Sequence, residues 1–171
     1  DGGVYAMKPQ TGENVWGYVM TKRGVNTVIS MSGNNAIVTH SEENLDTSEM
    51  GMIAALDATA KGKLGPANLK WSVKGFQAGV SSPIVDGDRI YQLDNSANLV
   101  AFDVTTGNEL WKLQLGTIQR AAPVFADGKL YVGTENGKFF ILRPSQTKCE
   151  ILSSVELPPS TTGLAQAGAP E

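Results

Sequence analysis

Two stretches of the sequence repeat each other at a fixed distance. Residues 82–91 read SPIVDGDRIY and residues 122–131 read APVFADGKLY, so Tyr91 and Tyr131 lie 40 positions apart. The Asp-Gly pair moves by one position inside the stretch, but the length stays the same. A repeat of this length indicates copies of one supersecondary unit, because each copy buries its apolar face against the next.

A second set of residues also returns, with a tryptophan at its end. The two sets lie 95 positions apart and are Ala6, Thr11, Gly12, Trp16 and Ala101, Thr106, Gly107, Trp111. Trp71 lies 40 positions before the last of these tryptophans and 55 after the first. The period is therefore close to 40 residues with one expanded unit, and the same spacing predicts Ile151 at the tryptophan position of the fourth copy.

Each unit predicts four short strands. In the third unit, β-branched and aromatic residues cover 82–85, 89–93, 98–103 and 108–115, and Gly, Asp, Asn or Thr separates these runs. Four antiparallel strands per unit are typical of one blade of a β-propeller. A β-sandwich or jelly roll also has many short strands, but it does not need Ala, Gly and Trp at matched offsets. A β-helix repeats much faster.

The strand pattern divides the chain into an all-β partial propeller, residues 1–157, and a loop or linker, residues 158–171. About three and a half blades are expected: the outer strands of one blade in 3–19, then blades in 24–73, 78–115 and 118–157. The sequence opens in the middle of a strand pattern, so we expect it to be a fragment of a longer protein. The alternative is self-association, in which two copies close one ring through their open blades.

Charge and composition exclude several classes of protein. The 171 residues are 41% apolar and 18% charged, which is enough apolar material for a core. Fourteen basic and 17 acidic residues give a net charge of -3, and the basic residues are scattered, so a nucleic-acid partner is not expected. No apolar run approaches the roughly 18 residues of a transmembrane segment. Cys149 is the single cysteine, and we expect it to be a buried or half-buried residue on a strand.

Residues 101–111, AFDVTTGNELW, resemble the pyrroloquinoline-quinone-like repeat of the quinoprotein alcohol dehydrogenase-like β-propellers. In that family the pattern Ala-x-Asp-x-x-Thr-Gly-x-x-x-Trp is a tryptophan-docking motif. The first copy has Lys8 in place of Asp, and the fourth has Ile141 and Arg143 at the Ala and Asp positions. The structural blade-docking residues are expected to be Ala6, Thr11, Gly12, Trp16, Ala55, Asp57, Trp71, Ala101, Asp103, Thr106, Gly107 and Trp111.

The motif also has a physical interpretation. A Trp near the end of an outer strand can bury about 200 Å² against the next blade while its indole N–H finds a backbone carbonyl. Asp can accept hydrogen bonds from the N–H groups of the turn. Small Ala lets the third strand of the blade pack closely. These tryptophans are therefore expected to be structural rather than to stack on a cofactor.

The expanded second unit holds the candidate site residues. Glu42, Glu43, Asp46 and Glu49 supply oxygen ligands that Ca²⁺ prefers, but their spacing does not match an EF-hand loop. A solvated acidic loop is the favoured interpretation, and these four residues are weak metal candidates. His40 is expected to be a hydrogen-bonded surface residue at a strand end.

Two functions are compatible with the sequence. The resemblance favours a non-enzymatic scaffold in the cell envelope, similar to the periplasmic lipoprotein that assists outer-membrane protein assembly. Such a scaffold binds a protein partner or ligand, needs no cofactor, and is periplasmic or secreted. The alternative is a fragment of an alcohol dehydrogenase dependent on pyrroloquinoline quinone (PQQ) and Ca²⁺. Those enzymes commonly pair adjacent cysteines over the cofactor, whereas Cys149 stands alone, and no catalytic residue can be assigned here.

Overall fold

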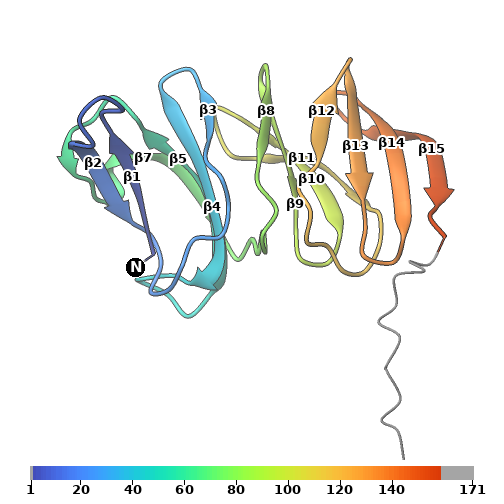
Figure 1. The fold of residues 1–171 in the computed structure, drawn as a ribbon, viewed down its shortest axis with the longest axis horizontal. Coiled ribbons are helices and arrows are strands. Elements are labelled where there is room, and N and C mark those ends of the chain that lie inside the picture. The colour runs from blue at the N-terminus through green and yellow to red at the C-terminus, as the bar shows by residue number, and fades with distance from the viewer. Residues whose placement is uncertain (1, 159–171) are drawn as a thin grey trace, which may run out of the picture.

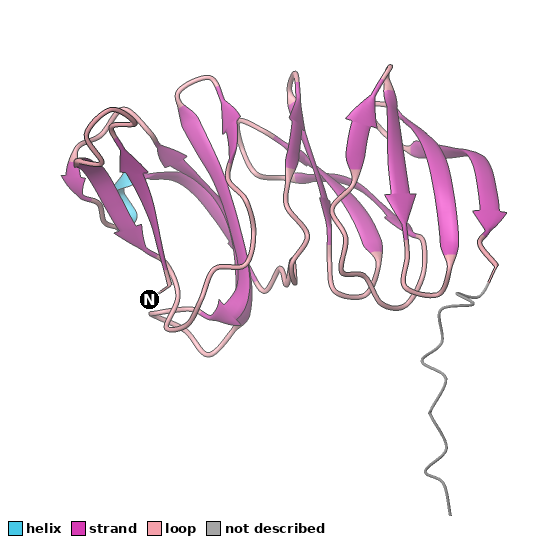
Figure 2. Cartoon of the chain, in the orientation of Figure 1, coloured by secondary structure: helices cyan, strands magenta, loops and turns pink. Residues whose placement is uncertain are grey.

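The computed structural model describes residues 2–158, which form four β-sheets side by side along the long axis of the molecule (Figure 1). The predicted linker 158–171 lies outside the described residues except for Pro158. Loops and strands make up nearly all of this part of the chain, with one short 3-10 turn, η1 (Pro66–Asn68) (Figure 2). The all-β prediction is confirmed. None of the described residues forms a helix with the length and hydrophobicity of a membrane span.

Three of the sheets are antiparallel meanders of four strands, as predicted from the runs of β-forming residues. The second sheet contains β3 (Ser30–Ser32), β4 (Asn35–Glu43), β5 (Met50–Asp57) and β7 (Leu69–Lys74). The third sheet contains β8 (Ile84–Asp86), β9 (Arg89–Leu93), β10 (Asn98–Asp103) and β11 (Glu109–Gln114). The fourth sheet contains β12 (Val124–Ala126), β13 (Lys129–Gly133), β14 (Lys138–Pro144) and β15 (Cys149–Glu156).

The first sheet is completed by a strand from the second unit. It consists of β1 (Gly3–Met7), β2 (Asn14–Val19) and β6 (Gly62–Lys63), in the order β1-β2-β6. β6 runs parallel to β2, with Trp16 opposite Gly62 and Gly17 opposite Lys63. The sequence predicts only two strands here, because the Gly-rich segment around β6 has the composition of a turn. The expanded unit therefore reaches back across the boundary between the first two sheets.

The alanine and tryptophan of the repeat lie opposite each other. Three such pairs join the last two antiparallel strands of a sheet, and each is followed directly by a β-bulge: Ala6 with Trp16, Ala55 with Trp71, and Ala101 with Trp111. In the fourth sheet the bulge is at the same place, but Ile141 lies opposite Ser153. The prediction of Ile151 at this position is wrong, because the hairpin between β14 and β15 is two residues longer than the one between β10 and β11.

Each tryptophan contacts the sheet that follows its own. The indole N–H groups of Trp16, Trp71 and Trp111 donate to the backbone carbonyls of Ala58, Val104 and Ser145, each at 3.0 Å. All three carbonyls lie in the hairpin between the third and fourth strands of the next sheet. Trp16 and Trp111 are 4% and 7% exposed.

Two of the three hairpins that hold these acceptor carbonyls are fixed by motif aspartates, Asp57 and Asp103. Asp57 Oδ1 accepts from the backbone N–H and hydroxyl of Thr59, and Lys70 donates to its other oxygen at 2.8 Å. These bonds hold the pKa of Asp57 at about 2, with the Lys70 bond contributing most. Asp103 makes the same type of turn by accepting from Thr105 and Thr106.

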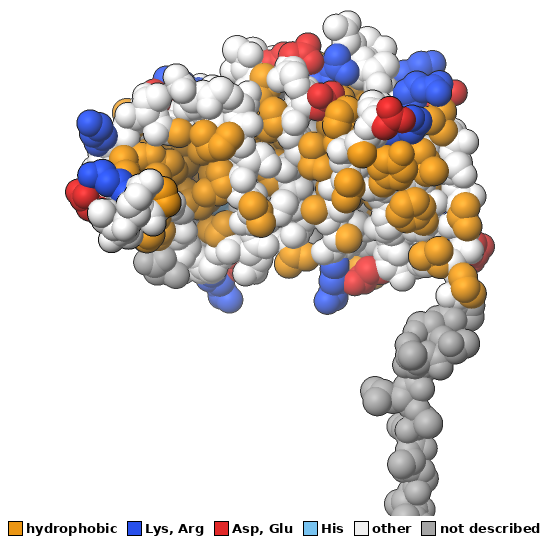
Figure 3. Space-filling view, turned by 45° about the horizontal axis from the view of Figure 1, so that its top comes forward, with side chains coloured by type: hydrophobic (Ala, Val, Ile, Leu, Met, Phe, Trp, Pro, Cys, Tyr) orange, Lys and Arg blue, Asp and Glu red, His pale blue; other side chains and the backbone are white. Residues whose placement is uncertain are grey.

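The core consists of three apolar clusters, one between each pair of neighbouring sheets. The cluster between the first two sheets joins Trp16, Tyr18 and Met20 to Met52 and the strand β5. Ile37, Ile53 and Phe102 belong to the next cluster, and Tyr91, Trp111 and Leu142 belong to the last. Hydrophobic side chains are exposed over both end sheets (Figure 3), including Tyr5 on the first and Phe139 on the fourth. Each inner sheet is therefore buried on both faces.

Candidate functional site

The acidic insertion, residues 41–49, does not gather its carboxylates into one site. Asp46 accepts a hydrogen bond from Lys74 Nζ at 2.7 Å, which is the main reason that its pKa is lowered. Glu42 and Glu43 lie on β4, both 3.9 Å from the Arg23 guanidinium. Within residues 2–158, no three His, Cys, Asp or Glu side chains are grouped as metal ligands would be. The four carboxylates, of which Glu49 is the last, are therefore neighbours in sequence and not a ligand set in this conformation.

Asn44 holds the insertion against the body of the protein. Its side-chain NH₂ group donates to the carbonyls of Glu49 and Gly51 at 2.7 and 3.0 Å. The Thr21 hydroxyl donates to the carbonyl of Glu43 at 2.8 Å, so the start of the insertion is also tied to the first unit. Asn44 and Thr21 are both 1% exposed. The sequence pattern did not predict this role for Asn44, because a polar residue in an acidic stretch is typical of a solvated loop.

His40 is buried, which corrects the expectation of a surface residue. It lies inside β4 and is 1% exposed. Burial lowers its pKa below the usual value, although the nearby Glu42 and Asn44 oppose this effect. Neither imidazole nitrogen makes a hydrogen bond of normal geometry within the described part of the chain. The imidazole is therefore held neutral inside the sheet stack at neutral pH.

Cys149 is half-buried at the first position of β15, as predicted, and it packs against the cluster between the third and fourth sheets. Burial raises the pKa of its thiol to about 12. The thiolate is the reactive form of cysteine, so this residue is a poor nucleophile at neutral pH.

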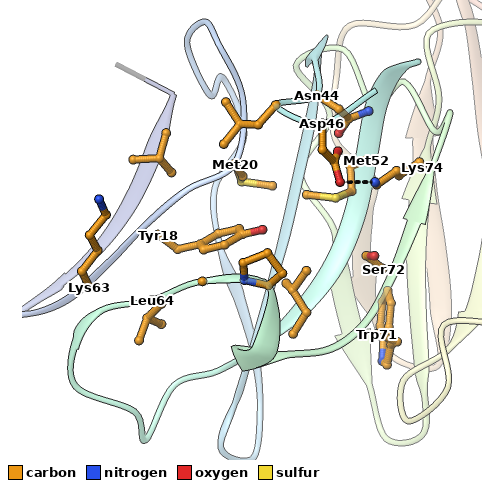
Figure 4. A pocket seen from close by; sticks show the side chains of 15 residues that line it. Tyr18, Met20, Asn44, Asp46, Met52, Lys63, Leu64, Trp71, Ser72 and Lys74 are labelled. Atoms are coloured by element: carbon orange, nitrogen blue, oxygen red, sulfur yellow. Dashed lines mark hydrogen bonds and ion pairs between the residues drawn. The ribbon is translucent and has the colours of Figure 1, made fainter. Parts of the chain in front are cut away.

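A hollow lies between the outer strands of the first two sheets (Figure 4), and we name it the rim groove. Its volume is about 800 Å³. Tyr18, Met20 and Met52 line its interior. Three segments form its borders: residues 63–66, the β7 residues Leu69, Trp71, Ser72 and Lys74, and the insertion residues Asn44, Leu45 and Asp46. The groove therefore combines an apolar interior with charged residues at its border, a composition typical of binding sites.

The expanded second unit builds most of this groove. β6 places Lys63 and Leu64 beside β2, because its backbone pairs with Trp16 and Gly17. The acidic insertion covers one end, where Asp46 and Lys74 are joined (Figure 4). Without these two added segments, the one around β6 and the acidic insertion, the interior of the groove would lie open to solvent.

Tyr18 brings a hydroxyl group to the groove. It is 7% exposed, and its hydroxyl makes no hydrogen bond with any residue that the structure describes. Burial raises its pKa, and the negative charge of Asp46 raises it further. The hydroxyl is therefore a protonated hydrogen-bond donor that is turned into the hollow (Figure 4). Trp16, Tyr18 and Met20 alternate in the sequence, which could have shown that they share a face, but not what that face meets.

The comparisons with known proteins agree on the fold. Residues 1–163 match the family model described as outer membrane protein assembly factor BamB. No curated protein sequence matches the chain.

Three solved structures share the fold. BamB from Moraxella catarrhalis matches with a TM-score of 0.65 at 16% identity, over 91% of this chain and 42% of that one. The computationally designed Ika8 protein gives 0.71 at 14% identity, over 92% and 44%. A europium-containing methanol dehydrogenase gives 0.54 at 16% identity, over 79% and 26%. The chain thus spans less than half the length of each, and it belongs to the pyrroloquinoline-quinone-like repeat β-propeller family that is described as outer membrane protein assembly factor BamB.

Proposed function

We propose that this chain is a non-enzymatic, protein-binding scaffold of the cell envelope and acts in the periplasm. The observation that carries the proposal is the family match over residues 1–163, because that family is described as an assembly factor for outer membrane proteins. The site chemistry supports it. The single cysteine, Cys149, has a thiol with a raised pKa, and the carboxylates of the acidic insertion are dispersed.

The scaffold proposal also agrees with the distribution of side chains. The three apolar clusters tie each sheet to the next, and the motif tryptophans add a hydrogen bond at each boundary. The repeated residues therefore serve to pack the sheets together, and the loops and edge strands remain available to bind a partner.

The experiment is a binding measurement with the purified 171-residue chain and the purified periplasmic parts of an outer-membrane protein assembly machinery. Biolayer interferometry should show saturable binding. A sample unfolded and refolded in the presence of reductant should bind equally well, because Cys149 takes no part. Lack of binding to every component at concentrations of about 100 μM, a range that covers weak transient complexes, would argue against this scaffold role.

A second candidate is part of a quinone-dependent dehydrogenase, and the structural likeness to the methanol dehydrogenase favours it. Its test is titration of the same chain with pyrroloquinoline quinone and Ca²⁺, followed by an assay for dye-linked alcohol oxidation. The scaffold proposal expects neither saturable quinone binding nor oxidation. Both results together would replace the scaffold by the dehydrogenase.

A further inference from the structure

Edge strands border the rim groove on both sides. β6 is the last strand of the first sheet, and β7 is the last strand of the second. On its outer side an edge strand presents backbone N–H and C=O groups that no neighbouring strand uses. Extended peptides bind such edges through main-chain hydrogen bonds, and a side-chain pocket beside the edge supplies specificity.

The chain itself shows how an extended segment enters this region. β6 pairs with β2 over two residues, and the backbone N–H of Leu64 then donates to the carbonyl of Gly17 at 2.8 Å. The Leu64 side chain is 6% exposed and packs in the cluster between the first two sheets. A short extended segment followed by one inserted apolar side chain is therefore a geometry that this interface already accepts.

The interior of the groove suits a large apolar side chain next to a backbone carbonyl. Met20 and Met52 are flexible and polarisable, so they can adapt to an aromatic or aliphatic group. The Tyr18 hydroxyl lines the groove without a hydrogen-bond partner among residues 2–158, so it is free to donate to an acceptor that enters the groove. A peptide carbonyl beside the inserted side chain would supply that acceptor.

The charges at the border favour an acidic neighbour of this side chain. Lys63 is exposed at the groove and makes no ion pair within the described residues. Lys74, by contrast, is already neutralised by Asp46. Two lysines and one carboxylate leave the border with one unneutralised positive charge, which is complementary to an Asp or Glu of the ligand.

We infer that the rim groove binds an extended peptide segment of a partner protein, which adds to the edge of β7 and places a bulky apolar residue followed by an acidic one against Tyr18 and Lys63. This site rests on the proposed scaffold function and gives that function a partner chemistry. It also gives a role to the expanded second unit, whose two added segments border the groove.

The test uses the 171-residue chain and three fluorescein-labelled peptides: Ser-Thr-Phe-Asp-Val-Thr-Ser, the same peptide with Lys in place of Asp, and the same peptide with Ala in place of Phe. Fluorescence anisotropy should show saturable binding of the Phe-Asp peptide with a Kd below about 1 mM. The other two peptides should bind at least about 5-fold more weakly, because each lacks one recognised group.

Four variants separate the groove from the rest of the surface. Ser72→Trp fills the groove from an exposed position and should weaken Phe-Asp binding at least about 10-fold. Lys112→Trp occupies the matching position of the third sheet and should bind normally, since Val100 pairs with Lys112 as Ala54 pairs with Ser72. Lys63→Glu should reverse the preference between the Asp and Lys peptides, whereas Lys61→Glu should not.

Tyr18→Phe removes one hydroxyl and should weaken Phe-Asp binding about 5-fold without changing the order of the three peptides. Laurate is the competing probe for an acyl chain. If laurate binds in a way that Ser72→Trp blocks while no peptide binds, an acyl-chain site replaces the inferred peptide site. Equal binding of all three peptides, or an unchanged Kd in Ser72→Trp, also overturns the inference.

The two proposals fail in different ways. If the chain binds the outer-membrane assembly proteins and Ser72→Trp binds them equally well, the scaffold function stands and the groove is not its partner site. If the Phe-Asp peptide binds in the groove but no assembly protein binds, the peptide site stands and the proposed cellular role is wrong.

Discussion

Replacement of Trp111 by Ala tests whether the tryptophans hold neighbouring sheets together. The side chain is 7% exposed, its ring centroid lies 5.9 Å from that of Tyr91, and its indole N–H donates to the Ser145 carbonyl at 3.0 Å. Burial of about 200 Å² at about 25 cal/mol per Å² gives an upper estimate near 5 kcal/mol. The range for large-to-small core substitutions is about 3–5 kcal/mol. We therefore expect Trp111→Ala to lower the free energy of unfolding by about 3–5 kcal/mol.

A milder variant separates the hydrogen bond from the burial. Trp111→Phe keeps most of the apolar surface but loses the indole N–H, and Ser145 is exposed enough for its carbonyl to be hydrated. Its expected cost is about 1–2 kcal/mol. The neighbouring Leu110 is 38% exposed, so Leu110→Ala is the matched control with an expected cost of about 1 kcal/mol or less.

The assay is urea unfolding followed by far-UV circular dichroism, which does not depend on tryptophan fluorescence. With a slope of about 2 kcal/mol per M, the Trp111→Ala midpoint should fall by about 1.5–2.5 M relative to the unsubstituted chain. The order of midpoints should be unsubstituted, Leu110→Ala, Trp111→Phe and Trp111→Ala. A Trp111→Ala midpoint equal to that of Leu110→Ala would refute the packing argument.

Three further predictions concern a turn, a buried histidine and the acidic insertion. Gly107 has φ +74°, and a Cβ there would overlap the Trp71 ring, whereas Gly128 has φ +66° and open space around it. Gly107→Ala should therefore cost at least about 2 kcal/mol more than Gly128→Ala in urea unfolding, and equal costs would contradict the contact. Because burial lowers the folded-state pKa of His40 below 6.5, the unfolded chain takes up a proton first as the pH falls. The free energy of unfolding should therefore be full above pH 6.5 and fall by up to about 1.4 kcal/mol per pH unit as the pH drops toward the lowered pKa. His40→Gln should flatten this part of the profile, and identical stability profiles for the variant and the unsubstituted chain would disprove the prediction. Calcium at about 5 mM would fill even weak sites with a Kd near 10⁻³ M. It should nevertheless leave the melting temperature within about 1 °C of its value in the same concentration of Mg²⁺, whereas a shift of several degrees specific to Ca²⁺ would establish a metal site in the insertion.

The sequence predicted the part of the fold that depends on local pattern. Runs such as 89–93 and 98–103 contain β-forming residues between turn residues, and both became strands of a meander. The repeat also predicted that neighbouring units would have the same strand order, which the second, third and fourth sheets confirm. Local pattern suffices here because each hairpin pairs segments only a few residues apart.

Features that depend on distant pairing were not predictable in this way. β6 contains only Gly62 and Lys63, which have low strand propensity, and its partner β2 lies more than 40 residues earlier. The expectation that His40 lies at the surface was wrong because β4 is buried on both faces. The alternation of buried and exposed residues that normally separates core from surface is therefore missing from Ala36 to His40. The rim groove is assembled from segments that are far apart in the sequence, and each of them has the pattern of an ordinary strand or turn.

The borrowed strand β6 also has a consequence for the order in which the protein can fold during synthesis. Trp16 is buried, but its acceptor Ala58 and its neighbour Gly62 leave the ribosome more than 40 residues later. The hairpin β1–β2 therefore emerges first and must wait, with its apolar face uncovered, until the second unit has been made. The third and fourth units have no such delay within their own sheets. The boundary between the first two sheets therefore becomes protected only once residues up to Leu64 are free of the exit tunnel.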